Sequence, residues 1–89
     1  MAQLDTDYIE AQLKLAEKGA PEDQYRVGLI YATGDGVPAD LITAHKWFNL
    51  AAMNGVIEAR ESRAEISMDM APDEIAVAQK LAREWYLAQ

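Results

Sequence analysis

Glycine and proline residues divide this chain into five segments, and each segment has the apolar spacing of a helix. Apolar side chains recur every three or four positions, whereas no alternating run of β-branched and aromatic residues exceeds a few positions. The breaks fall at Gly19, Gly34–Gly36, Gly55 and Pro72. The spacing therefore predicts an all-α fold, with helices at about 5–18, 21–33, 39–54 and 56–68 and from Pro72 onward.

One side of each predicted helix is apolar, and we expect these sides to form a common core. In the first two helices the expected inward residues are Tyr8, Ile9, Ala11, Leu15, Ala16, Val27, Leu29, Ile30 and Tyr31. In the last three they are Ala44, Trp47, Phe48, Ala51, Ala52, Ala59, Ile66, Met70, Ile75, Ala78, Leu81, Ala82 and Trp85. Gly28 lies inside the second helix, where glycine costs about 1 kcal/mol relative to alanine. We therefore expect a neighbouring helix to approach its backbone closely.

The composition limits the classes of protein to which the chain can belong. Its 89 residues form one domain, and the absence of cysteine excludes disulfides and thiolate metal sites. A net charge of −7 argues against nucleic acid and anionic membranes as partners. No apolar run approaches the roughly 20 residues of a membrane-spanning helix, and Met1–Asp5 lacks the features of a secretory signal. We expect a cytoplasmic location.

Two parts of the chain repeat one another. Leu15–Gly19 is echoed by Ala51–Gly55, 36 residues later. A second echo, at a distance of 34 residues, pairs Ala44, Trp47 and Ala51 with Ala78, Leu81 and Trp85. A period in the mid-thirties is typical of solenoids, in which neighbouring helix pairs stack to bury a continuous core.

The stretch from Gly19 to Ala59 resembles the Sel-one-like repeat, a relative of the tetratricopeptide repeat. The matching positions are Val27, Gly28, Tyr31, Gly34, Gly36, Val37, Asp40, Ala44, Trp47, Ala51, Ala52, Gly55 and Ala59. The resemblance implies antiparallel helix pairs stacked as a short right-handed α–α superhelix of about five helices. It also implies a single domain over 1–89, with an N-terminal helix at 5–18, the best-matching repeat at 19–55 and a capping helix pair at 56–89. Asp23 departs from the family pattern, which has a small alanine there, so we expect looser packing or an outward carboxylate.

The resemblance further implies a non-catalytic protein–protein interaction module, in which the first helix of each pair lines a concave binding face. Applied to this chain, it selects as partner-binding residues Glu22, Tyr25, Leu29, Thr33, Glu58, Glu61, Glu65 and Met68. Four carboxylates around apolar and aromatic groups suit a basic segment of another protein, although they are equally typical of a solvated face. The alternative is a structural homo-oligomer whose repeat ends stack, with Tyr86 and Leu87 at the exposed end.

The residue types that carry catalysis are scarce. His45 is the only histidine, and it lacks the further ligands or paired motif of a metal or proton-transfer site. We interpret it as a solvent-facing or packing residue. Gly34 and Gly36 lack the third glycine of a dinucleotide fingerprint and are better interpreted as a turn. We therefore expect no enzymatic activity, no metal and no cofactor.

Overall fold

The computed structural model describes residues 4–89, which form five helices and no strand. The helices are α1 (Thr6–Glu17), α2 (Pro21–Thr33), α3 (Leu41–Met53), α4 (Ile57–Ser67) and α5 (Pro72–Leu87). The all-α prediction is confirmed, and the boundaries lie close to the predicted ones. Residues 1–3, part of the segment in which we expect no secretory signal, lie outside the described residues.

Helix boundaries follow from local chemistry. The Asp5 carboxylate accepts a hydrogen bond from the backbone N–H of Tyr8 and so caps α1. Asp40 caps α3, because its side chain accepts from both the backbone N–H and the hydroxyl of Thr43. At the end of α2, Gly34 has a left-handed backbone with φ of 72°, and its N–H donates to the carbonyl of Ile30. These caps orient the turns that connect the pairs.

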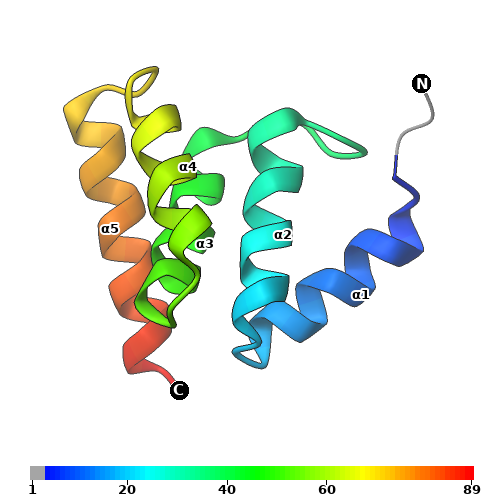
Figure 1. Cartoon of the computed structure of the whole chain (residues 1–89). Helices are drawn as coiled ribbons and strands as arrows, with labels where there is room; N and C mark the ends of the chain where they lie inside the picture. The colour runs from blue at the N-terminus through cyan, green and yellow to red at the C-terminus, as the bar shows by residue number, and fades with distance from the viewer. Residues whose placement is uncertain (1–3) are drawn as a thin grey trace.

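Helix α3 is the centre of the molecule. It packs against α2, α4 and α5, while α1 packs obliquely on α2 (Figure 1). Two groups of buried side chains form the core, and α3 contributes to both. One consists of Ala16, Val27, Trp47, Leu50 and Ala82, and the other of Ala44, Phe48, Ala51, Val56 and Ala59. The core thus runs continuously across the stacked helices, as expected for a helix-pair repeat.

The close approach predicted at Gly28 is confirmed. A Cβ atom placed on Gly28 would lie 2.5 Å from two ring carbons of Phe48. Phe48 is completely buried and belongs to α3. The absence of a side chain at Gly28 therefore allows the Phe48 ring to lie directly against the backbone of α2.

The predicted inward face of α1 is wrong by one position. Tyr8 and Leu15 are each 41% exposed, and Ala11 is also exposed. Ile9 and Ala16, which were included in the prediction, are buried, and Leu13 packs beside Ala16. The buried positions keep the three-to-four-residue spacing of one helical face. Apolar residues lie on more than one side of α1, and its docking on α2 selects the face with Ile9.

Two leucines predicted as core residues are also largely exposed. Leu29 and Leu81 are each 37% exposed. In α2, the buried side consists of Gln24, Val27, Gly28 and Ile30, so Leu29 projects away from it. In α5 the buried positions are Ala78 and Ala82, which leaves Leu81 at the edge of the packed face. Asp23 turns its carboxylate toward Arg26 on its own helix, at 3.1 Å from the Nη1 atom.

The first and last helices meet over α3. The Trp85 ring packs edge-on against Trp47, with 5.9 Å between ring centroids. Its Nε1–H donates a hydrogen bond of 2.8 Å to the carboxylate of Glu17, at the end of α1. This contact joins residues that are 68 positions apart in the sequence. Across residues 4–89, no helix combines the length and the apolar character that crossing a bilayer requires.

Candidate partner-binding groove

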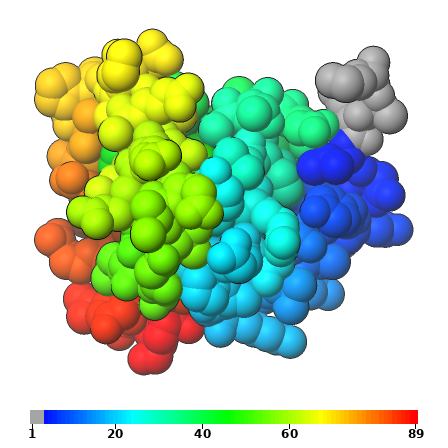
Figure 2. All heavy atoms as spheres, viewed as in Figure 1, coloured from blue at the N-terminus to red at the C-terminus, as the bar shows by residue number. Residues whose placement is uncertain are grey.

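A shallow hollow lies between α2 and α4, which are neighbours on the face shown in Figure 2 (cyan and yellow-green). Its volume is about 230 Å³. Each wall is built from residues spaced by three and four along a helix, and therefore on one helical face. The lining residues are Leu29, Ala32 and Thr33 of α2, Phe48 of α3, and Ser62, Glu65 and Ile66 of α4. We call this hollow the α2–α4 groove.

Tyr25 lies beside the groove and contacts residues on both of its neighbouring helices. Its ring centroid lies 5.7 Å from that of Phe48, and its hydroxyl oxygen lies 3.4 Å from Oγ of Ser62. These contacts link α2 to both α3 and α4. Tyr25 is half-buried, so it acts mainly as part of the scaffold of the groove and presents only one edge to solvent.

The structure brings together only part of the predicted binding set. Leu29, Thr33 and Glu65 line the groove, and Tyr25 lies beside it. The other predicted residues are exposed on α2, on α4 or just after α4, but they do not line the groove. They are Glu22, Glu58, Glu61 and Met68. Met68 follows the end of α4 and is 84% exposed.

The charge of the groove margin is not neutralised within the described residues. Over residues 4–89, the single ion pair joins Arg26 to Asp23. The predicted set contains the glutamates Glu22, Glu58, Glu61 and Glu65. None of them therefore has a cationic partner in that range. Their carboxylates are exposed to solvent, and that of Glu65 lies in the lining of the groove.

Four groove residues were not predicted to contact a partner. Phe48 and Ile66 were placed in the core because they are apolar, and Ala32 and Ser62 were not selected at all. Phe48 lies beneath the groove, with its ring buried against the backbone of Gly28. Ser62 and Ile66 are four residues apart on α4, and each follows a predicted glutamate by one position. A shift of one residue in the assumed face of α4 would have identified both.

A second hollow, of about 320 Å³, lies on the other side of α2. It is lined by Leu4, Tyr8, Arg26, Leu29, Ile30, Thr33 and Asp35. Leu29 and Thr33 line both hollows and form the ridge between them. The Asp35 carboxylate accepts a hydrogen bond from the backbone N–H of Leu4, which closes the end of this second hollow.

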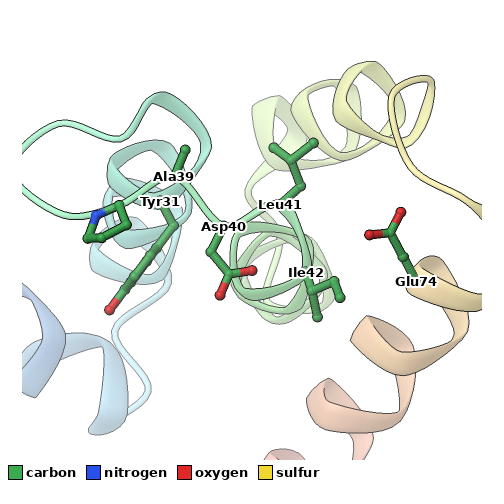
Figure 3. Close-up of a pocket in the computed structure, with 7 residues that line it drawn as sticks. Tyr31, Ala39, Asp40, Leu41, Ile42 and Glu74 are labelled. Carbon is green, nitrogen blue, oxygen red and sulfur yellow. The ribbon is translucent and has the colours of Figure 1, made fainter.

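A third and larger hollow, of about 520 Å³, lies beside the connection between α2 and α3 (Figure 3). Its two carboxylates, Asp40 and Glu74, come from different helices. Both already accept backbone hydrogen bonds, Asp40 from Thr43 and Glu74 from Ala71. They therefore act as helix caps. Within residues 4–89, histidine and carboxylate side chains form no group of three or more that could hold a metal ion.

Comparison with known proteins agrees with this architecture. Residues 21–56, which comprise α2 and α3 with their flanking turns, match the sequence model of the Sel1 repeat. The chain is 38% identical over 61 residues to the uncharacterized protein NMB1327 of Neisseria meningitidis serogroup B, covering 68% of this chain and 13% of that protein.

A solved structure has the same fold. It is that of c5321, described as a protective antigen present in uropathogenic Escherichia coli strains and displaying an SLR fold. The TM-score is 0.82 at 27% identity, over 86% of this chain and 17% of c5321. The chain thus spans less than a fifth of the length of either relative. Because the family match falls on the helix pair in which the repeat motif occurs, and 86% of the chain matches the fold of an SLR protein, this chain contains a Sel1 repeat within an SLR fold.

Proposed function

We propose that this chain is a non-catalytic protein–protein interaction module that binds a basic segment of a partner in the α2–α4 groove. Sel1 repeats generally mediate contacts between proteins. The observation that carries the finer proposal is the combination of an apolar lining, which includes Leu29 and Ile66, with Glu65 in the same hollow and further glutamates, unpaired within residues 4–89, exposed on α2 and α4. No cofactor enters this function.

The two parts of the groove contribute differently to binding. An apolar side chain of the partner would contact Leu29 and Ile66, above the buried ring of Phe48, and burial of its surface would supply most of the affinity. Lysine or arginine residues on either side would meet the exposed carboxylates. Each such exposed ion pair contributes about 0.2–1 kcal/mol, but together they would accelerate association and make binding sensitive to salt.

The experiment is a selection of random peptides displayed on phage. The wild-type protein is the only target of the selection, and the affinity of each retained peptide is then measured for the wild type and for the Glu61→Lys/Glu65→Lys variant. We expect the retained peptides to carry lysine or arginine around one large apolar residue. We expect their affinity to fall about tenfold in the variant, which corresponds to about 1.4 kcal/mol. Retained peptides that are acidic, or that bind the variant equally well, would refute the proposal.

A matched control separates local charge from net charge. Glu10 and Glu84 are exposed glutamates on α1 and α5, away from the groove. The Glu10→Lys/Glu84→Lys variant changes the net charge by the same amount as the groove variant. We expect it to retain peptide affinity within about twofold at physiological salt, because distant exposed charges are screened. Equal losses in both variants would indicate a general effect of net charge.

A self-associating subunit remains the alternative function. This alternative is favoured by exposed apolar side chains at the two ends of the array. They are Tyr8 and Leu15 on α1, and Tyr86 and Leu87 on α5. In this arrangement the end of one copy would stack on the start of the next. Light scattering at micromolar concentration separates the two functions, since the interaction module is expected to be a monomer. A dimer that Leu87→Lys dissociates would favour the alternative.

A further inference from the structure

Four polar side chains, two of them buried and two half-buried, form a network between α3 and α4. His45 and Asn49 are one helical turn apart on α3, and they are 2% and 9% exposed. Arg63 and Ser67 are one turn apart on α4. Nδ1 of His45 lies 3.1 Å from Nδ2 of Asn49, and Nε2 of His45 lies 3.1 Å from Oγ of Ser67. Arg63 reaches Oδ1 of Asn49 at 2.6 Å.

The donors and acceptors of this network follow from Arg63, whose guanidinium can only donate. The Asn49 atom that faces it must therefore be the carbonyl oxygen, and the Asn49 amide group must donate to Nδ1 of His45. The ring proton is thus on Nε2, which donates to the Ser67 hydroxyl. That hydroxyl donates to the backbone carbonyl of Arg63 at 2.7 Å. The hydrogen bonds form a closed ring that begins and ends on Arg63.

Only neutral His45 completes this ring. A protonated imidazole would carry a second N–H, on Nδ1, pointing at the Asn49 amide group, which is itself a donor. Burial lowers the pKa of His45, and the positive charge of Arg63 on α4 lowers this pKa further. On α5 the nearby charged group is Arg83, which lines with Asn49 a hollow of about 210 Å³. Within residues 4–89, no carboxylate bonds to the imidazole.

We propose that this ring of hydrogen bonds holds α4 against α3 at neutral pH and is broken by acid. Protonation of His45 removes the acceptor for Asn49 and introduces a positive charge beside Arg63, so the two helices separate locally. Arg63 and Ser67 of this ring each follow a groove residue on α4, Ser62 and Ile66. Loosening of α4 would therefore displace one wall of the α2–α4 groove, and acid would weaken whatever binds there.

The first experiment determines the position of the ring proton. His45 is the only histidine in the chain, so a long-range ¹H–¹⁵N correlation spectrum of the untagged, labelled protein contains one imidazole. At pH 7.5 we expect the pattern of the Nε2–H tautomer, and a midpoint of titration below that of a free histidine. A proton on Nδ1, or a midpoint at or above the ordinary value, would overturn the proposal.

The second experiment measures stability against pH in the wild type and three variants. Below about pH 6.5 the unfolded chain takes up the His45 proton before the folded chain does. The folding equilibrium constant of the wild type should then fall by up to about tenfold per pH unit, relative to His45→Gln, until the folded protein also becomes protonated. The difference from His45→Gln removes the contribution of the carboxylates. Urea titrations from pH 7.5 to 5 give the folding equilibrium constants of the wild type and of His45→Gln.

Asn49→Asp reverses the polarity of the ring without changing its shape. The substituted carboxylate can accept from Arg63 and also from a protonated Nδ1, so we expect the pKa of His45 to rise. Relative to Asn49→Asp combined with His45→Gln, Asn49→Asp should then gain stability as the pH falls from 7.5 to 6. Parallel pH curves for the wild type, Asn49→Asp and His45→Gln would overturn the proposal. None of these measurements needs a partner, so their failure is distinct from failure of the proposed function.

Discussion

Replacement of Gly28 by alanine tests whether packing or helix propensity decides the sequence at the centre of α2. Propensity alone predicts that Gly28→Ala stabilises the protein by about 1 kcal/mol. The new methyl group, however, would lie 2.5 Å from two ring carbons of Phe48. Phe48 is fully buried and packs within the second core group, so a shift of its ring would disturb its contacts with other core side chains.

The expected magnitude follows from these two opposing terms. Overpacking of a tight core costs about 1–3 kcal/mol, which exceeds the gain in propensity. We therefore expect Gly28→Ala to lower the free energy of unfolding by about 1 kcal/mol, measured by urea denaturation at pH 7.5. In a Phe48→Leu background the clash is relieved, so the same substitution should be neutral or stabilising. The coupling energy of this double-mutant cycle should be about 1–3 kcal/mol.

A separate substitution calibrates the propensity term in this protein. Ala64 is exposed in the middle of α4, so Ala64→Gly should cost about 1 kcal/mol without any change of packing. If Gly28→Ala instead stabilises the wild-type protein by the same amount, the close contact between α2 and α3 is not a packing constraint. An unchanged effect in the Phe48→Leu background would also refute the reasoning.

Two further substitutions test the core and the start of α3. Trp47 is 2% exposed, so Trp47→Ala should cost about 3–5 kcal/mol, a large part of the stability of a small domain; an unchanged melting temperature would refute its place in the core. Asp40→Ala removes two hydrogen bonds to Thr43 and should cost about 1 kcal/mol. Asp40→Asn should retain most of that stability. If Asp40→Asn lowers the free energy of unfolding in urea as much as Asp40→Ala does, the effect comes from the charge of Asp40.

The helix boundaries were predictable because they depend on local chemistry. Proline at Pro21 and Pro72, and the capping carboxylates of Asp5 and Asp40, act within one helical turn. Such signals are read directly from neighbouring residues. They place α1–α5 close to their predicted positions without any knowledge of how the helices pack.

The inward face of α1 was less predictable, because this helix carries apolar residues on several sides. Tyr8 and Leu15 form one candidate stripe, and Ile9, Leu13 and Ala16 form another. Periodicity permits both stripes. Docking on α2 selects the second, and that selection depends on tertiary packing.

The α2–α4 groove was predictable on its α2 side and, on the α4 side, only at Glu65. Leu29 and Thr33 follow from the face of α2, but the register of α4 opposite them depends on how both helices pack on Phe48. The network between α3 and α4 had a weaker signal. His45 with Asn49, and Arg63 with Ser67, are polar pairs spaced by four residues, and nothing in the sequence pairs one with the other.

The hydrogen bond between Trp85 and Glu17 changes how the array should come apart. In a linear solenoid each repeat contacts only its neighbours, so the terminal helices fray independently at low cost. Here the last helix is attached to the first one across α3. Release of α5 therefore also removes a contact of α1, and amide hydrogen exchange in these two helices should report one shared opening event. We therefore expect the two ends of the array to open together.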